Sequence, residues 1–161
     1  MDKNIISLEH ASVADFEQLY GWFNNLRDIQ SWGGPELDYP LSSEVFINKL
    51  KIDQSCDYKL VDNQHNMQAF GQSYQRLGRK HFARLAVSPS QRGKGIGRLL
   101  LQHLMRETPQ DIKGRGFSLF VMKDNQVAIN LYQSMGFRFE TYPEFESGGL
   151  ADYLYMTAEP K

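Results

Sequence analysis

The chain has 161 residues, of which 41% are hydrophobic and 12% aromatic, and its formal net charge is −1. These values exclude wholesale disorder and predict a single folded domain over residues 1–161. No stretch approaches the ~20 apolar residues of a membrane span, and the first residues lack the apolar core of a signal peptide. Cys56 is the single cysteine, so no internal disulfide can form. We therefore expect a cytoplasmic protein.

The first third of the chain predicts one strand and two helices. An apolar run at residues 5–8 suits a strand, and Ser12 with Asp15 resembles the capping signature of a helix start. Apolar side chains then follow at helical spacing, at Phe16, Leu19, Tyr20 and Phe23. This first helix is expected to end at the Trp-Gly-Gly-Pro segment of residues 32–35. A second helix is expected to begin at Ser42 or Ser43.

The remaining pattern predicts a three-strand antiparallel meander followed by alternating helices and strands. Polar turns separate the meander strands at residues 58–61, 67–75 and 81–87. We expect two more helices, at residues 95–106 and 125–135, and three more strands, at residues 117–122, 137–142 and 153–157. Further turns are expected at residues 113–116 and 147–149. This order predicts a mixed α/β sheet flanked by helices.

The charge is unevenly distributed. Eight Lys and Arg residues lie from Arg76 to Arg106 with no Asp or Glu among them, and Gly93, Gly95 and Gly97 lie in the middle of this stretch. Glycines let a backbone approach a ligand closely, and a helix start adds unpaired amides and a positive dipole end. A solvated helix face is the ordinary alternative, but the glycines favour a phosphate or pyrophosphate site.

Two common phosphate loops do not fit this segment. An NTPase loop needs Ser or Thr after its Gly-Lys pair, whereas Gly95 follows Lys94, and the dinucleotide fingerprint needs G-x-G-x-x-G rather than the G-x-G-x-G found here. The segment Arg92-Gly-Lys-Gly-Ile-Gly97 instead resembles the R-x-x-G-x-G pyrophosphate loop of the GNAT superfamily of acetyl-CoA-dependent N-acyltransferases.

A second segment strengthens the resemblance. Residues 125–137 are similar to the family's N-x-x-A-x-x-L-Y…G-F segment, with Asn125, Ala128, Tyr132 and Gly136 at the matching positions. The resemblance covers residues 58–137. It implies the GNAT fold, in which a mixed and mostly antiparallel central sheet is splayed between its two middle strands, here residues 81–87 and 117–122.

The resemblance also implies the roles of single residues. Tyr132 would protonate the departing thiolate, and a phenol of pKa ~10 is suited to this because it keeps its proton at neutral pH. Without the motif, Tyr132 would be interpreted as a core aromatic of the helix. Asn125 would hydrogen-bond the cofactor arm, and Ala128 would leave room for it. Backbone groups would bind the arm at Leu85, Ala86 and Val87 and the pyrophosphate at Arg92, Gly93, Lys94, Gly95, Ile96, Gly97 and Arg98.

The acceptor side is less defined. The loop at residues 32–40 is where the family usually builds its acceptor pocket, which makes Trp32, Glu36 and Asp38 candidate substrate residues. The same acids, with Glu144 and Glu146, are candidates for attracting a cationic amine or acting as the general base, and Tyr74 and His81 are weaker candidates. No base is chosen among them. The four histidines lack metal-ligand spacing, so we expect no metal.

These observations predict an N-acetyltransferase that moves the acetyl group of acetyl-CoA to a primary amine, by direct attack in a ternary complex. The acceptor is a small molecule or a peptide, and both a monomer and a homodimer remain open. A catalytically silent acyl-CoA-binding sensor is the alternative, and Tyr132 favours the enzyme over it. We expect no nucleic-acid binding, because the charge converges on one glycine loop that lacks interleaved aromatics. We expect no membrane binding, because no apolar stretch is long enough to span one.

Overall fold

The computed structural model describes residues 5–52, 54–107, 116–143 and 151–160. Most of the predicted turns at residues 113–116 and 147–149, as well as Glu144 and Glu146, lie outside these ranges.

Within these described ranges, seven strands form one sheet in the order β1-β2-β3-β4-β5-β7-β6. Neighbouring strands are antiparallel except for the parallel pair β4–β5, so the predicted mixed sheet and its meander are confirmed. The last strand inserts between β5 and β6, which the sequence pattern did not indicate. The strands are β1 Ile5–His10, β2 Cys56–Asp62, β3 Met67–Arg76, β4 Arg79–Val87, β5 Phe117–Met122, β6 Arg138–Phe139 and β7 Tyr153–Ala158.

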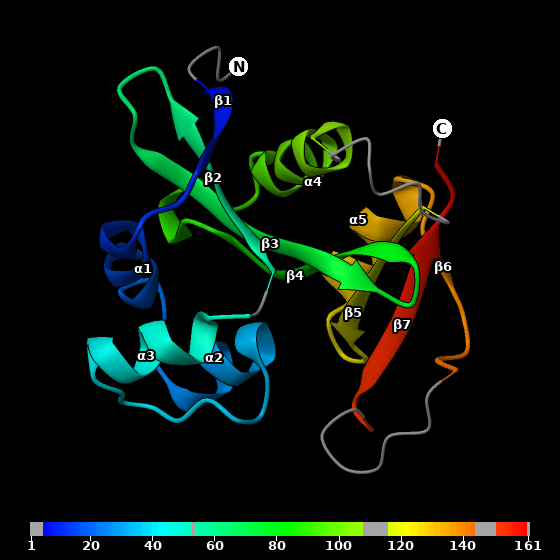
Figure 1. The fold of residues 1–161 in the computed structure, drawn as a ribbon, viewed down its shortest axis with the longest axis horizontal. Helices are drawn as coiled ribbons and strands as arrows, with labels where there is room; N and C mark the ends of the chain where they lie inside the picture. The colour runs from blue at the N-terminus through cyan, green and yellow to red at the C-terminus, as the bar shows by residue number, and fades with distance from the viewer. Residues whose placement is uncertain (1–4, 53, 108–115, 144–150, 161) are drawn as a thin grey trace.

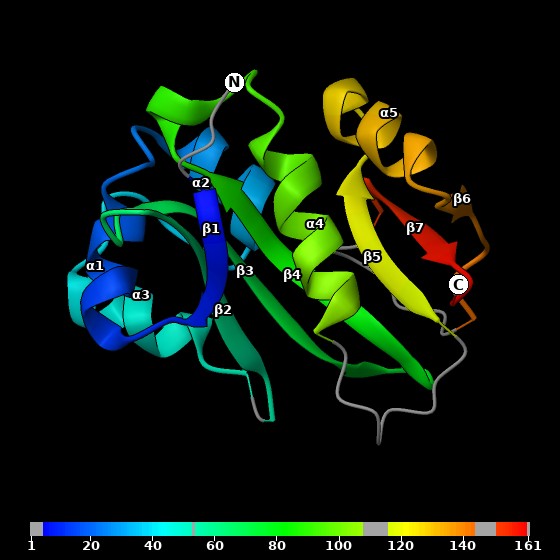
Figure 2. The ribbon, with the colours of Figure 1, turned by 90° about the horizontal axis from the view of Figure 1, so that it is seen from above.

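The sheet opens between β4 and β5. These strands pair only from Lys80 opposite Phe117 to Phe82 opposite Leu119, and Figure 2 shows them diverging towards their C-terminal ends. Residues 83–87 of β4 therefore have no strand partner on the β5 side within the described part of the chain. This confirms the predicted splay and leaves an open backbone edge in the middle of the sheet.

A β-bulge accompanies the splay. Gly71 of β3 lies opposite two residues of β4, Arg84 and Leu85, because the register passes from Phe70–Ala86 to Gln72–Ala83. Arg84 takes a left-handed backbone conformation, with φ of 53°. A bulge bends its strand and re-aims the side chains near it, and here it lies where β4 leaves β5.

Helices cover both faces of the sheet (Figure 1). On one face, α4 (Ile96–Arg106) and α5 (Gln126–Ser134) pack on a core that includes Leu100, Phe82 and Leu119. On the other, α1 (Val13–Tyr20), α2 (Leu26–Gly33) and α3 (Ser43–Leu50) enclose a second core around Phe46 and Phe70. A short 3-10 turn, η1 (Pro89–Gln91), leads from β4 to the glycine loop.

The predicted single helix before residue 32 is wrong, because the chain forms α1 and α2 there. Gly21 ends α1, and its N–H donates to the Gln18 carbonyl (3.1 Å). The Asn25 side chain then accepts from the Asp28 amide (2.9 Å) and starts α2. Phe23 is buried in the second core, between the two helices. Its helical spacing therefore reflects packing into a shared core and not a continuous helix.

Other boundaries follow local signals more closely. Asp15 accepts from the Ser12 amide (2.7 Å) at the start of α1, and Ser42 caps α3 by accepting from the Val45 amide (3.2 Å). The strand predicted at residues 137–142 is too long, since β6 ends at Phe139. Tyr142 leaves the sheet edge and accepts from the Arg76 side chain (2.9 and 2.6 Å).

Candidate active site

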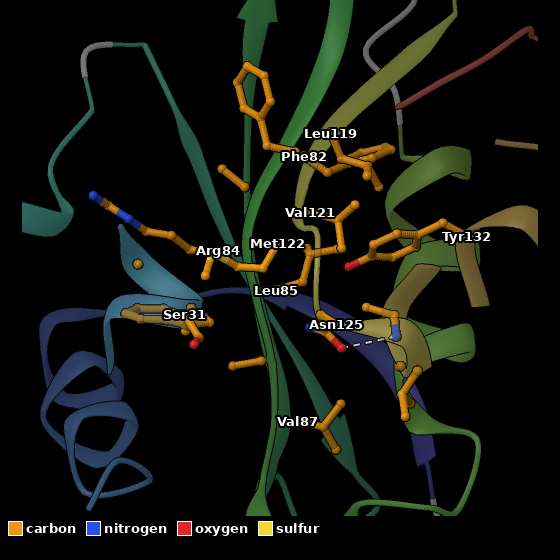
Figure 3. Close-up of a pocket in the computed structure, with 18 of the residues that line it drawn as sticks. Ser31, Phe82, Arg84, Leu85, Val87, Leu119, Val121, Met122, Asn125 and Tyr132 are labelled. Carbon is orange, nitrogen blue, oxygen red and sulfur yellow. Dashed lines mark hydrogen bonds between the residues drawn. The ribbon is translucent and has the colours of Figure 1, made fainter. Parts of the chain in front are cut away.

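A cleft of about 730 Å³ follows the opening between β4 and β5 (Figure 3). Four segments supply most of its walls: the end of β4, the glycine loop, the start of α5 and the C-terminal half of α2. The structure brings most of the sequence-predicted site residues together there, namely Trp32, Leu85, Ala86, Val87, Arg92, Gly93, Gly95, Ile96, Gly97, Asn125, Ala128 and Tyr132.

The glycine loop is an open cradle of backbone amides. Gly93 and Gly95 have φ of 76° and 83°, and a Cβ built on either would meet nothing within 4 Å. Gly95 is the N-cap of α4, so the first amides of α4 lack intrahelical acceptors at this point. A Cβ on Gly97 would lie 3.4 Å from Leu131 Cδ2, which shows how closely α4 approaches α5. This geometry fits a diphosphate group.

The charged side chains of the loop surround the cradle and do not fill it. Arg92 Nε donates to the Val87 carbonyl (3.3 Å). Arg98 donates to Ser134 Oγ (2.6 Å) and so ties α4 to α5. Lys94 is exposed, and the side chains of Lys94 and Arg98 do not line the cleft. Their contribution to an anion at the loop would be mainly long-range attraction.

Asn125 has a structural duty besides its predicted one. Its Oδ1 accepts from the Ala128 amide (3.2 Å) and caps α5, as the dashed line in Figure 3 shows. The carbonyl half of the side chain is therefore committed to the helix. Only the amino group remains available to donate to a ligand in the cleft.

Tyr132 projects from α5 with its hydroxyl directed towards the gap between the strands, near Val121 (Figure 3). The side chain is half-buried and its ring packs against Phe137 at 6.0 Å between centroids. Burial raises the pKa of Tyr132 to about 12. The phenol therefore keeps its proton across the physiological range and can donate a hydrogen bond into the gap.

The far end of the cleft contains residues that the sequence did not single out. Asp28 and Ser31 of α2 and Arg84 of β4 line it together with Trp32. Their spacing in the sequence does not indicate a shared site, because α2 and the β4 bulge meet only in the folded chain.

Two predicted acceptor residues lie elsewhere. Glu36 and Asp38 are exposed, and neither lines the cleft in the described part of the chain. Of the candidates predicted for the acceptor side, Trp32, Tyr74 and His81 line the cleft.

The observation that identifies the chain comes from sequence comparison. The sequence model described as the acetyltransferase (GNAT) family matches residues 20–137, which include the glycine loop, Asn125 and Tyr132. The chain belongs to the GNAT acetyltransferase family.

Two proteins are similar to this GNAT chain in sequence over part of its length. It is 40% identical over 77 residues to an uncharacterized protein of Mycobacterium leprae, which covers 47% of this chain and 20% of that protein. It is 31% identical over 102 residues to the ribosomal protein bS18-alanine N-acetyltransferase of Escherichia coli, covering 62% of this chain and 65% of that enzyme. The chain thus spans a fifth of the first relative and slightly under two-thirds of the second.

A solved GNAT structure shows the same fold at lower identity. The spermidine N-acetyltransferase of Vibrio cholerae, in complex with CoA and spermine, superposes with a TM-score of 0.73 at 20% identity. The match covers 96% of this chain and 95% of that one. Strand order, splay and flanking helices of this GNAT chain are therefore those of the family fold.

One of the two weaker base candidates of this GNAT chain, His81, is unsuited to accept a proton. His81 is buried and its Nδ1 lies 2.9 Å from Ser118 Oγ. Burial, assisted by the charge of Arg76, lowers the pKa of His81 to about 3, so its imidazole is a weak base. The Tyr74 hydroxyl accepts a hydrogen bond from the Arg76 side chain at 3.4 Å and lines the cleft.

The described ranges contain neither a candidate metal site nor a candidate membrane span. No group of three or more His, Cys, Asp or Glu side chains there could hold a metal ion. No helix in the same ranges is long and apolar enough to cross a membrane.

Proposed function

We propose that this chain is an acetyl-CoA-dependent N-acetyltransferase acting on a primary amine, and that residues 1–161 form its single catalytic domain. One observation carries the proposal. The amide cradle of the glycine loop and the protonated hydroxyl of Tyr132 lie on one continuous cleft, where the sheet of this GNAT-family chain opens.

The cleft is suited to a long ligand with a diphosphate at one end. Residues 83–87 of β4 offer an unpaired strand edge, to which an extended amide-containing arm can add like another strand. Gly93 and Gly95 place open amides at the diphosphate end. Asn125, whose amino group is free to donate, lines the same cleft. We therefore assign the predicted cofactor residues to acetyl-CoA, with the side chains of Lys94 and Arg98 attracting it from outside the cleft.

The chemistry follows from Tyr132. Bound acetyl-CoA would supply a thioester, whose carbonyl carbon a neutral amine can attack directly, forming the C–N bond as the C–S bond breaks. The amine nitrogen loses one proton in this step and the sulfur gains one, so the exchange balances. A phenol of pKa about 12 holds its proton more tightly than an ordinary thiol of pKa about 8.5. Tyr132 therefore acts first as a hydrogen-bond donor to the departing sulfur.

The substrates named for the relatives indicate the class of acceptor only broadly. By their names, the E. coli relative acts on the alanine of a ribosomal protein and the V. cholerae structure is a spermidine acetyltransferase. Both substrates present an amine, one on a polypeptide and one on a small molecule. We propose an amine acceptor of one of these two kinds, which enters from the α2 end of the cleft.

Release of free thiol from acetyl-CoA tests the proposal directly. The purified protein is incubated with acetyl-CoA and a panel of amino acids, peptides and polyamines, and acetyl-CoA binding is measured separately by calorimetry. Amine-dependent thiol release above the rate without amine supports the enzyme. Tight acetyl-CoA binding with no release across the whole panel would instead support the sensor alternative.

A further inference from the structure

Arg84 is a charged residue that the proposed chemistry leaves unused. It lies in the β4 bulge, is partly buried and lines the α2 end of the cleft. In Figure 3 its side chain extends from β4 on the side away from Tyr132. The two side chains therefore lie on opposite sides of β4.

The guanidinium of Arg84 has no carboxylate partner within 4.0 Å among the described residues. One terminal nitrogen donates to the Lys49 carbonyl (3.0 Å) and to Gln72 Oε1 (3.4 Å). An arginine carries five N–H donors, so three remain. Burial lowers the pKa of Arg84, and the more distant charges of Glu36 and Asp57 partly offset this.

The backbone and side chain of Arg84 are held in place by specific contacts. A left-handed backbone strains a non-glycine residue, and such strain clusters at functional sites. Gln72, which is fully buried, accepts from Arg84 and donates to Asp57 (2.8 Å) and to the Leu50 carbonyl (2.8 Å). This network fixes one nitrogen of the guanidinium and leaves the rest of the fork available.

The same end of the cleft has a second donor without an acceptor. The indole N–H of Trp32 is buried and makes no hydrogen bond within the described ranges. Asp28 is the one carboxylate among the described lining residues, and it already accepts from the Asn25 side chain (3.0 Å). This end of the cleft therefore holds unused donors on both Arg84 and Trp32.

We propose that Arg84 binds a carboxylate of the acceptor, so that the substrate is an amine that also carries a carboxylate. This inference rests on the proposed function and deepens it. Carboxylates match the planar fork of a guanidinium, and charge-assisted bonds of this kind are the strong ones. A polyamine would bring only like charge to Arg84. Asp28, on the same wall, is of the right sign for the acceptor's ammonium group.

A structural role for Arg84 must be separated from this one. Its bond to the Lys49 carbonyl places a cation at the C-terminus of α3, where cations stabilise a helix. Loss of that contact alone would lower stability and affect every acceptor equally. Only carboxylate binding predicts a loss that depends on the acceptor's chemistry.

The test uses amines in matched pairs, each amino acid beside its carboxamide and its decarboxylated amine. In the wild-type protein we expect kcat/KM at least 10-fold higher for the carboxylate member. In Arg84→Gln we expect a 10- to 100-fold loss for that member, through KM, with the carboxamide changed less than twofold. Arg84→Lys keeps the charge and should recover part of the loss. Lys49→Gln, which removes an exposed cation nearby, is the control and should change neither member.

Binding gives a readout that does not depend on turnover. Calorimetry of the same pairs on the protein saturated with CoA should show tighter binding of the carboxylate member, reduced at least 10-fold in Arg84→Gln. If no amine releases thiol but this pattern holds, the proposed function fails and the carboxylate site stands. Equal binding and equal turnover of both members in the wild type would overturn the site, even if Arg84→Gln does not fold.

Discussion

Gly71 of β3 lies directly against Leu85 of the β4 bulge: a Cβ built on Gly71 would fall 2.8 Å from Leu85 Cδ2. Leu104 of α4 closes the same space at 3.1 Å. Because Leu85 also lines the cleft, the missing side chain at Gly71 allows the bulge, the helix and the cleft wall to pack together.

Gly71→Ala should therefore disturb the cleft as well as the core. The added methyl group displaces the Leu85 side chain, and overpacking of this kind costs about 1–3 kcal/mol. We expect the Tm to fall by several degrees and acetyl-CoA binding to weaken several-fold, measured by thermal unfolding and calorimetry. Gly21→Ala, at the end of α1, is the control and should leave acetyl-CoA binding unchanged. Unaltered binding in Gly71→Ala would separate the bulge from the cofactor site.

Tyr132→Phe should reduce turnover without changing cofactor affinity. Removal of the hydroxyl deletes the hydrogen-bond donor to the departing sulfur, and loss of one such donor to a developing charge costs about 10²–10³-fold in kcat. We expect kcat to fall about 100-fold or more, with the acetyl-CoA dissociation constant within twofold of wild type. Tyr155→Phe alters a buried tyrosine that does not line the cleft and should keep full activity.

The pH dependence offers an independent check on the same residue. Because burial raises the pKa of Tyr132 to about 12, its protonated and active form persists as the pH rises to 10. The wild-type kcat should therefore show no fall near pH 10 from this group. A fall in kcat centred near pH 10 that is absent from Tyr132→Phe would show that the tyrosine titrates normally.

Gly95→Ala should weaken cofactor binding through the backbone. Gly95 has φ of 83° and open space around it, so the cost is conformational strain of about 1–2 kcal/mol rather than a clash. Relaxation of that strain would rotate the amides of the cradle. We expect the KM for acetyl-CoA to rise about 10-fold.

Gly78→Ala is the matched control. Gly78, in the β3–β4 turn, has φ of 75° and equally open surroundings. The two variants should lose similar stability, while only Gly95→Ala should change the KM. Equal kinetic effects would argue against the glycine loop as the diphosphate site.

Lys80→Met should stabilise the protein at neutral pH. The Lys80 side chain is 1% exposed and donates to the Leu104 carbonyl (3.1 Å) near the end of α4. Burial lowers its pKa from the ordinary 10.5 to about 8, which corresponds to a cost of about 3 kcal/mol for the charged amine. The substitution removes this cost but also the hydrogen bond to the Leu104 carbonyl. We therefore expect a net increase of about 2 kcal/mol in the free energy of unfolding at pH 7.

The sign of the pH dependence follows from proton counting. Between pH 8 and 10.5 the unfolded chain binds more protons at Lys80 than the folded chain, so wild-type stability gains from this residue as the pH rises. That gain is complete above 10.5 and lost as the pH falls through 8. The free energy of unfolding in urea should be compared at pH 7 and 9.5. It should not rise between these pH values through this residue in Lys80→Met, whereas Lys51→Met, at an exposed position, should keep the wild-type rise.

Much of the architecture follows from local sequence signals. The strand predicted at residues 117–122 is β5 itself, and Ser42 caps α3 as expected. The glycine pattern predicted an open loop at the start of α4, and Gly93 and Gly95 form one. Each of these features depends on residues close together in the chain, so spacing and residue type were sufficient.

Tertiary structure alone decided the acceptor end of the cleft and the duties of single side chains. Arg84 adopts its backbone conformation because Gly71, on another strand, leaves room for a bulge, and Asp28 reaches the cleft because α1 and α2 separate around Phe23. Asn125 caps α5 with its side-chain oxygen, a contact that the family pattern does not indicate. Local periodicity cannot encode such contacts. They arise only when surfaces from distant parts of the chain pack together and each buried polar group bonds to the partner within its reach.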